Sequence, residues 1–239
     1  MCGIAGFVND MPIDVKCPVL QRMTDMIAHR GPDSEGHYID EHAALGHRRL
    51  SIIDLGGGQQ PIYNEDGSKV ITFNCEIYDY QTLREELIAA GHTFTTKSDT
   101  EVLLHGYEQW GVDLLQRVRG MFTFVIWDKN KQELFGARDH FGIKPFYYAK
   151  MNGTFMYASE IKSLLRHPDF VKELNAEALK PYMTFQYPAI GETFFKGVYK
   201  LPEGHYFTYR DGKMDIHRYY DEDFREGKQK LGELVNSID

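Results

Sequence analysis

A cysteine beside the initiating methionine is the residue of this 239-residue sequence best placed for nucleophilic chemistry. If Met1 is removed, Cys2 carries its own α-amino group, whose pKa is about 7.7–8.0. That amine can take the proton of the thiol, whose ordinary pKa is about 8.5. One residue would then supply both the nucleophile and the base. If Met1 is retained, Cys2 has no free amine and the base is missing.

The remaining cysteines and the histidines form no recognisable metal-binding pattern. Cys2, Cys17 and Cys75 are an odd and widely spaced set, which is a poor disulfide framework. No cysteine and histidine group has zinc spacing, and none of the ten histidines belongs to an HExxH motif. The glycine run 56–58 lacks the lysine and Ser/Thr of a phosphate-binding loop. We therefore expect no metal and no cofactor in this domain.

The composition is that of an ordinary globular protein. Lys and Arg number 27 against 35 Asp and Glu, a net charge of −8, which argues against nucleic-acid binding. No apolar run approaches the roughly 20 residues that cross a bilayer, so no membrane contact is expected. The N-terminus lacks the pattern of a secretory signal, which predicts a cytoplasmic protein.

The hydrophobic patterns predict strands and helices mixed within one domain, followed by a polar tail from residue 221. Strands are expected at 3–8, 43–55, 70–76, 121–128, 133–138, 146–149, 154–158, 203–209 and 214–219. Helices are expected at 18–29 with Pro18 in the first turn, at 81–90, from 98 toward 110, and at 111–118, 161–165 and 176–183. Ser98 to Glu101 has the capping-box pattern. Asn152-Gly153 and Asp211-Gly212 are typical of hairpin turns.

Seven short motifs follow one another along this framework. They are Met1-Cys2-Gly3-Ile4, His29-Arg30-Gly31-Pro32-Asp33, Arg49-Leu50-Ser51-Ile52-Ile53, Phe73-Asn74-Cys75-Glu76-Ile77-Tyr78, Ser98-Asp99-Thr100-Glu101, Arg138-Asp139-His140-Phe141-Gly142-Ile143-Lys144-Pro145 and Ala158-Ser159-Glu160. The series resembles the N-terminal glutaminase domain of glutamine-hydrolysing asparagine synthetases. These are class II glutamine amidotransferases of the N-terminal-nucleophile hydrolase superfamily. The resemblance extends from Cys2 to about Tyr220.

This resemblance implies an α+β fold, an αββα sandwich of two antiparallel sheets between helical layers. It implies cleavage of L-glutamine to glutamate and ammonia through a thioester on Cys2. Residues 1–220 would be the amidotransferase domain, and 221–239 a tail leading to a synthetase domain that this chain lacks. ATP and magnesium would act only in that partner domain, whose ammonia-dependent reaction amidates aspartate. A homodimer is compatible with the resemblance.

Glutamine is a zwitterion, so its site needs a cation for the carboxylate and anions for the ammonium group. Arg49 matches the cation of the family and can bind a carboxylate through two hydrogen bonds. Glu76 and Asp99 match the family positions that hold the α-amino group. Backbone groups of four consecutive residues would line the pocket: Leu50, Ser51, Ile52 and Ile53.

The tetrahedral intermediate needs hydrogen-bond donors aimed at its oxygen. In the family these donors are the Asn side chain and the next backbone N–H of an Asn-Gly-Glu turn, which here correspond to Asn74 and Cys75. Cys75 stands where the family usually has glycine, so a side chain enters the wall of the oxyanion hole. A thiol there would also lie near Cys2. Asp79 replaces a more usual Asn, a milder change.

Two other interpretations remain open. One is the glutaminase domain of another class II amidotransferase, such as glucosamine-6-phosphate synthase, although Pro32 favours the asparagine type over the sugar type, which usually has Tyr there. The other is a catalytically impaired module that binds glutamine or serves a structural role. Cys75 and a retained Met1 would favour the impaired module, and ammonia release would exclude it.

Overall fold

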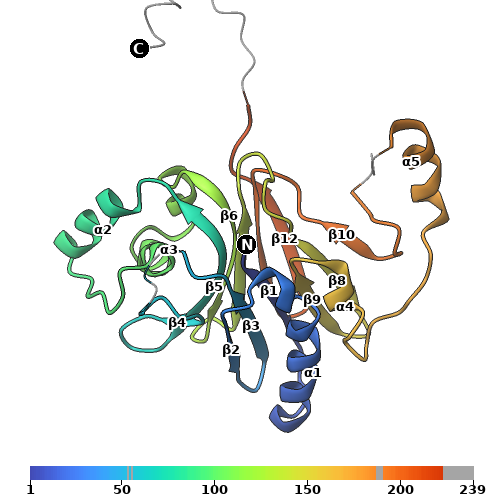
Figure 1. Ribbon diagram of the computed structural model, residues 1–239, viewed down its shortest axis with the longest axis horizontal. Coiled ribbons are helices and arrows are strands. Elements are labelled where there is room, and N and C mark those ends of the chain that lie inside the picture. Colours follow the sequence, from blue (N-terminus) through green and yellow to red (C-terminus); the bar gives the residue numbers. More distant parts are fainter. Residues whose placement is uncertain (53, 55, 187–190, 223–239) are drawn as a thin grey trace, which may run out of the picture.

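Two six-stranded antiparallel sheets face each other in the computed structural model, which describes residues 1–52, 54, 56–186 and 191–222 (Figure 1). The first sheet has the order β10 (Val198–Lys200), β8 (Tyr147–Met151), β9 (Thr154–Ala158), β1 (Gly3–Val8), β3 (Ala43–Arg49) and β2 (Ser34–Ile39). The second sheet has the order β12 (Lys213–Arg218), β11 (His205–Arg210), β7 (Glu133–Arg138), β6 (Gly120–Asp128), β5 (Lys69–Ile77) and β4 (Ile62–Tyr63).

Helices cover the outer face of each sheet. Helices α1 (Ile13–Asp25) and α4 (Ile161–Leu164) pack on the first sheet, and α2 (Tyr80–Ala89) and α3 (Asp99–Trp110) pack on the second. The inner faces share a core that includes Ile4, Trp127, Phe146, Phe155 and Phe207. This arrangement confirms the predicted αββα sandwich. The other short elements are η1 (Ala28–Arg30), η2 (Gly111–Gln116), η3 (Ala176–Ala178) and α5 (Leu179–Phe185), which projects from the body at the right of Figure 1.

Helix α1 starts and ends earlier than the predicted range of 18–29. Pro12, rather than Pro18, precedes its first turn, and the carbonyl of Pro12 accepts hydrogen bonds from that turn. Pro18 lies inside the helix, where it removes one backbone donor. Burial of Leu20 and Met23 against the first sheet keeps the helix intact despite this loss.

The strand predicted at 43–55 ends at Arg49, because the next backbone groups turn toward other partners. The N–H of Leu50 faces the sulfur of Cys2, and the N–H of Ser51 donates to Asp33. Strands β2, β4 and β10 were missing from the sequence prediction. Both predicted hairpins are present: Asn152-Gly153 and Asp211-Gly212 all have the positive φ that a type I′ turn requires.

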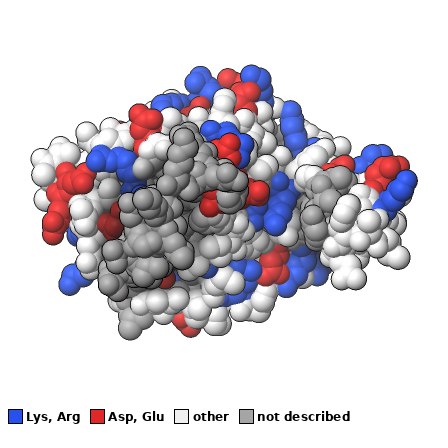
Figure 2. Space-filling model, turned by 90° about the horizontal axis from the view of Figure 1, so that it is seen from above, with Lys and Arg blue, Asp and Glu red and all other residues white. Residues whose placement is uncertain are grey.

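Charge is mixed on the surface that Figure 2 shows. Basic and acidic side chains alternate over this face without a large area of one sign. In the part of the chain that the structure describes, none of the helices has both the length and the apolar character needed to cross a membrane.

Candidate active site

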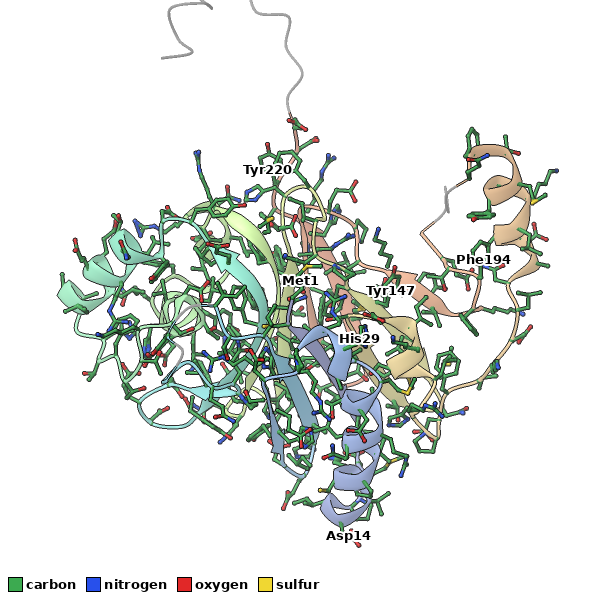
Figure 3. All side chains as sticks on the ribbon, in the orientation of Figure 1. Met1, Asp14, His29, Tyr147, Phe194 and Tyr220 are labelled. Carbon is green, nitrogen blue, oxygen red and sulfur yellow. The ribbon has the colours of Figure 1, made fainter. Side chains whose placement is uncertain are left out.

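A cavity of about 90 Å³ lies beside Met1, which Figure 3 labels near the middle of the molecule. It brings together residues from distant motifs of the sequence. The predicted site residues that line it are Cys2, Arg49, Leu50, Ile52, Asn74, Glu76 and Asp99. A thiol, a guanidinium, a side-chain amide and two carboxylates therefore surround one space.

Cys2 precedes β1 and points its thiol into this cavity. The sulfur lies 3.5 Å from the carbonyl oxygen of Leu50 and 3.4 Å from the Leu50 N–H. Burial raises the pKa of the Cys2 thiol above its usual value. The thiol thus needs a base close by to become a nucleophile near neutral pH.

Two of the sequence motifs hold the nucleophile in place. The Arg30 Nε donates to the carbonyl of Cys2 at 2.9 Å, and the same guanidinium pairs with Glu160 at 3.1 Å. Ser159 exchanges hydrogen bonds with Ile4, since its hydroxyl accepts from the Ile4 N–H and its own N–H donates to the Ile4 carbonyl. These contacts fix the backbone on both sides of the bond between Cys2 and Gly3.

Arg49 ends strand β3 and is almost fully buried at the cavity wall. Its Nη2 donates to the carbonyl of Asp54 at 2.7 Å. A Cβ on Gly58 would lie 2.9 Å from that Nη2, so a glycine there leaves room for the guanidinium. The neighbouring Arg48 points to the opposite face of the sheet, as alternation along a strand requires, and pairs with Asp25 and Glu35.

Asp99 begins helix α3, lines the cavity and is 3% exposed. Its Oδ2 accepts from the N–H of Ile77 at 3.1 Å, and Ser98, the N-cap, donates its hydroxyl to Oδ1. Burial raises the pKa of Asp99 to about 6, although these hydrogen bonds oppose the shift. Glu76 also lines the cavity and is exposed to solvent on β5.

The side-chain amide of Asn74 is fully buried at the cavity wall. Neither its Nδ2 nor its Oδ1 has a hydrogen-bond partner among the described residues. A buried amide without partners costs roughly 1–3 kcal/mol, so a site that keeps one has a use for it. The amide is available to a group that enters the cavity.

The direction of the Cys75 backbone follows from its neighbours on β5. The N–H of Phe73 donates to Gln60 at 2.6 Å, and the N–H of Ile77 donates to Asp99. Hydrogen-bonding directions alternate along a strand, so the N–H of Cys75, midway between them, faces the same side. Gln60 and Asp99 both line the cavity on that side.

Three predicted residues are not placed in the cavity wall. Ser51 is half-buried and donates its N–H to Asp33 at 2.7 Å instead, so it shapes the loop after Arg49. Ile53 lies outside the described residues. The side chain of Cys75 is also outside the description, so its predicted position near Cys2 is not tested.

Several lining residues were not predicted as site residues, although five of them lie in quoted motifs. They are Met1, Gly58, Gln60, Phe73, Ser98, Thr100, Met121 and Lys144. Gln60 links two walls, because its Oε1 accepts from Phe73 and its Nε2 donates to Thr100. Its position carries no local sequence signal that distinguishes it from other polar loop residues.

Lys144 reaches the cavity through the loop that follows β7. The Arg138 Nε donates to the Lys144 carbonyl at 2.7 Å, and Asp139 accepts from the Lys144 N–H at 3.0 Å. Gly142 has φ +62°, and a Cβ there would lie 2.8 Å from the Arg138 guanidinium. The Lys144 Nζ contacts the sulfur of Met1 at 3.1 Å. The Arg-Asp motif thus positions an ammonium group at the mouth of the cavity.

The sequence matches the glutamine amidotransferase domain family over residues 1–220. It is 44% identical to glutamine-hydrolysing asparagine synthetase 1 of Bacillus subtilis, with 100% of this chain covering 38% of that protein. It is 35% identical to asparagine synthetase 3 of the same organism, again over 100% of this chain and 39% of the relative. The chain thus spans about two fifths of the length of these relatives.

A solved structure shares the fold. The glutamine phosphoribosylpyrophosphate amidotransferase of B. subtilis superposes with a TM-score of 0.66 over 92% of this chain and 50% of that one. The two sequences are only 16% identical, so the likeness concerns the fold. It agrees with the two sheets and outer helices described above.

Proposed function

The chain belongs to the glutamine amidotransferase domain family, and on that premise we propose that it hydrolyses the side-chain amide of L-glutamine to give glutamate and ammonia. The observation that carries the proposal is the cavity shared by the thiol of Cys2 and the unpartnered amide of Asn74. A nucleophile and an unpartnered hydrogen-bond donor that line the same small cavity suit acyl transfer from an amide.

The chemical step begins when the Cys2 amine, freed by removal of Met1, takes the thiol proton. The sulfur attacks the side-chain carbonyl carbon, and the oxygen becomes an oxyanion facing the Asn74 Nδ2 and the Cys75 N–H. The ammonium group of Cys2 returns the proton to the nitrogen, which leaves as ammonia. Water then attacks the thioester, and glutamate departs with the thiol restored.

The charged groups of the cavity suit the two charged groups that free glutamine carries on its α-carbon. Arg49 would bind the α-carboxylate, and Asp99 with Glu76 would bind the α-ammonium group. Leu50 and Ile52 would support the substrate from the loop after β3. This set of charges favours a free amino acid over a glutamine within a peptide.

Met1 itself lines the cavity, with its sulfur against Lys144. Its removal would enlarge the space beside Cys2 and expose the α-amino group at the same time. We therefore include processing of Met1 in the proposed function, because both the base and the room for substrate depend on it.

We further propose that the ammonia serves a synthetase domain that amidates aspartate with ATP and magnesium, and that the reaction takes place in the cytoplasm. The asparagine synthetases among the relatives favour this acceptor over that of other amidotransferases. The glutaminase step itself requires no cofactor, since Cys2, Asn74 and water supply every group that reacts.

Release of ammonia and glutamate by protein lacking Met1 tests the proposal. Cys2→Ala should lower the rate by at least about a thousandfold, because the nucleophile is lost. Cys17→Ala is the matched control, since this thiol is exposed on α1 outside the cavity. A diazo-ketone analogue of glutamine should label Cys2 and spare Cys17.

Labelling that persists in Cys2→Ala would contradict the assignment of the nucleophile. Glutamine binding without release of ammonia, in protein shown by intact mass to lack Met1, would instead favour the impaired module.

A further inference from the structure

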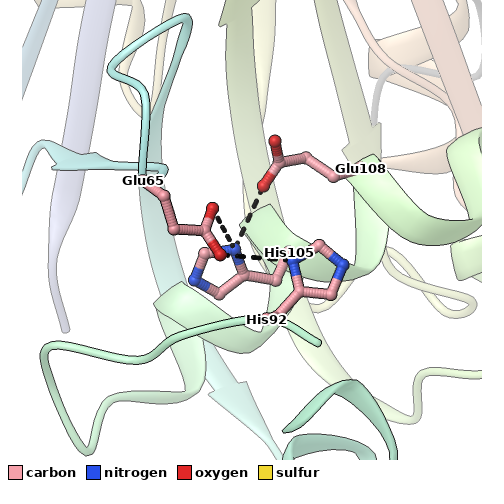
Figure 4. Close-up of side chains that lie close together, drawn as sticks. All are labelled: Glu65, His92, His105 and Glu108. Atoms are coloured by element: carbon pink, nitrogen blue, oxygen red, sulfur yellow. Dashed lines mark hydrogen bonds and ion pairs between the residues drawn. The ribbon is translucent and has the colours of Figure 1, made fainter. Parts of the chain in front are cut away.

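Four potential metal ligands gather beside helix α3 (Figure 4), and none of them lines the cavity. Glu65 lies in the turn between β4 and β5, and His92 follows α2. His105 and Glu108 are on α3, where a spacing of three places both side chains on one face. His105 lies about 9 Å along the helix axis from Asp99, at 1.5 Å per residue.

The ligand atoms of these four side chains lie within 4.8 Å of one another. The His105 Nδ1 lies 3.0 Å from Glu108 and 3.4 Å from Glu65, and the His92 Nδ1 lies 3.4 Å from Glu65. Bonds of about 2.0–2.1 Å around a tetrahedral ion place neighbouring ligand atoms about 3.3–3.4 Å apart. The two separations of 3.4 Å involve different oxygens of Glu65, so a rotation of that carboxylate and small movements of the other side chains would be needed to close the group around one ion.

We propose that Glu65, His92, His105 and Glu108 bind one divalent transition-metal ion, for which zinc is the best fit. Imidazole nitrogens favour zinc and its neighbours in the first row over magnesium or calcium, which prefer oxygen ligands. Two carboxylates with two neutral imidazoles balance the charge of the ion. Four protein ligands without an open position are typical of a structural zinc site.

Surrounding groups orient both histidines with their Nδ1 atoms toward the shared centre. The His92 Nε2 lies 3.3 Å from the Oε1 of Gln109, and metal-bound histidines usually donate their second ring N–H to an oxygen of this kind. The His105 Nε2 faces the carboxylate of Glu101 at 3.6 Å, which is too long for a hydrogen bond, so a small shift of one side chain would be needed to form the same contact. The orientation of the rings thus suits a metal.

The carboxylates are held as well. The Glu108 Oε1 accepts from the Asn64 Nδ2 at 2.6 Å, which leaves Oε2 toward His105. The Glu65 Oε1 accepts from the Thr93 N–H at 3.0 Å. The site is therefore built from fixed side chains rather than from freely moving surface groups.

One side of the proposed metal site is buried and the other side is accessible to solvent. The side chain of His105 is 1% exposed and that of Glu65 is 39% exposed. An ion can enter on the Glu65 side, and His105 closes the other side. Bound metal would connect the turn at Glu65, the loop at His92 and helix α3. It would thereby stabilise the segment that leads to Asp99.

Zinc binding by the whole chain tests this site. Protein stripped of metal with a chelator should bind one zinc ion whose binding depends on His92. Competition with a chromophoric chelator measures the number of bound ions and their affinity. Zinc at about a hundredfold its Kd should raise Tm by about 5–10 °C, whereas magnesium should not. His92→Gln should weaken binding of this ion by at least about a hundredfold.

His217→Gln is the matched control, because His217 is an exposed histidine on β12 outside the group. Zinc held elsewhere, on thiols for example, is common to both variants and cancels in their comparison. Glu65→Gln, at an exposed position, repeats the test if His92→Gln fails to fold. Equal zinc binding by the cluster variants and His217→Gln, or no zinc binding by the wild type, would overturn the proposal and leave an ion-pair cluster only.

Discussion

Two buried carboxylates lie two residues apart in the first turn of α3 and face different regions of the molecule. Asp99, 3% exposed, faces the cavity, and Glu101, 1% exposed, faces Thr95, Thr96 and His105 instead. Burial raises the pKa of Asp99 to about 6. Burial acts on Glu101 in the same direction, but the ion pair with His105 and hydrogen bonds from Thr95 and Thr96 outweigh it and hold the pKa at about 2.

The difference lies in what surrounds each carboxylate. Four donors of Thr95 and Thr96, two N–H groups and two hydroxyls, reach Glu101 at 2.6–3.0 Å. Asp99 receives bonds from Ile77 and Ser98 and borders an open space. The buried charge of Glu101 therefore stabilises the fold. The cavity leaves buried charge incompletely compensated, which is the condition for binding a charged substrate.

The largest expected effect is the loss of stability in Glu101→Ala. Removing this buried carboxylate takes the acceptor from four donors of Thr95 and Thr96 and an ion-pair partner from the buried His105, so the free energy of unfolding should fall by about 3–5 kcal/mol in denaturant titrations. Glu86→Ala is the control, because Glu86 forms an exposed pair with Arg117 and should cost less than about 1 kcal/mol. If Glu101→Ala raised the KM for glutamine and left the free energy of unfolding unchanged, the roles assigned to Glu101 and Asp99 would be wrong.

Asp99→Asn should have the opposite effect on stability. The pKa of Asp99 is higher in the folded chain than in the unfolded one, so its ionisation opposes folding as pH rises through about 6. Removal of the charge should raise the free energy of unfolding by roughly 2–3 kcal/mol at pH 8, and the gain should vanish below about pH 4.

The same substitution should weaken glutamine binding, since it removes the anion for the ammonium group. Calorimetry on the unreactive Cys2→Ala protein isolates this step. Its affinity for glutamine should fall about tenfold per unit as pH drops below 6, and the double variant with Asp99→Asn should lose that dependence. If the affinity for glutamine falls with the same midpoint pH in both proteins, a group other than Asp99 is responsible for the pH dependence.

Arg49→Ala and Arg48→Ala together compare two neighbouring arginines on β3. The loss of a charge-assisted contact of about 2–3 kcal/mol should raise the KM for glutamine about 30- to 160-fold. Arg48→Ala should leave KM near the wild-type value, because Arg48 pairs with Asp25 and Glu35 on the other face. Steady-state kinetics at fixed pH measure both, and an unchanged KM in Arg49→Ala rules out its role.

The smallest expected effect is that of Cys75→Gly, in the strand that carries Asn74. Glycine retains the backbone N–H, and if the Cys75 side chain crowds the oxyanion hole as the sequence predicts, its removal should raise the glutaminase rate several-fold. If the Cys75 thiol comes near Cys2, reversible inactivation by an oxidant should also disappear. An unchanged rate and an unchanged response to oxidant would show that the cavity tolerates the cysteine.

Local chemistry made parts of the fold predictable from the sequence. Asn152-Gly153 specifies a turn because both residues accept positive φ, and Ser98 caps a helix because its hydroxyl accepts from the Thr100 N–H. The second half of the predicted capping box is absent, since Glu101 binds Thr95 and Thr96 instead. The start of α1 was missed because packing on the sheet outweighs the cost of Pro18 within the helix.

The residue order alone predicts which chemical groups are available: a cysteine after Met1, and an arginine and two carboxylates in recognisable motifs. Which of these groups meet depends on the fold. Cys2 and Arg49 reach one cavity with Asp99, whereas Glu65 and His105 meet beside the helix that begins at Asp99. The reason is physical: short-range propensities depend on neighbouring residues, but a cavity or a ligand group requires long-range packing that brings distant segments together.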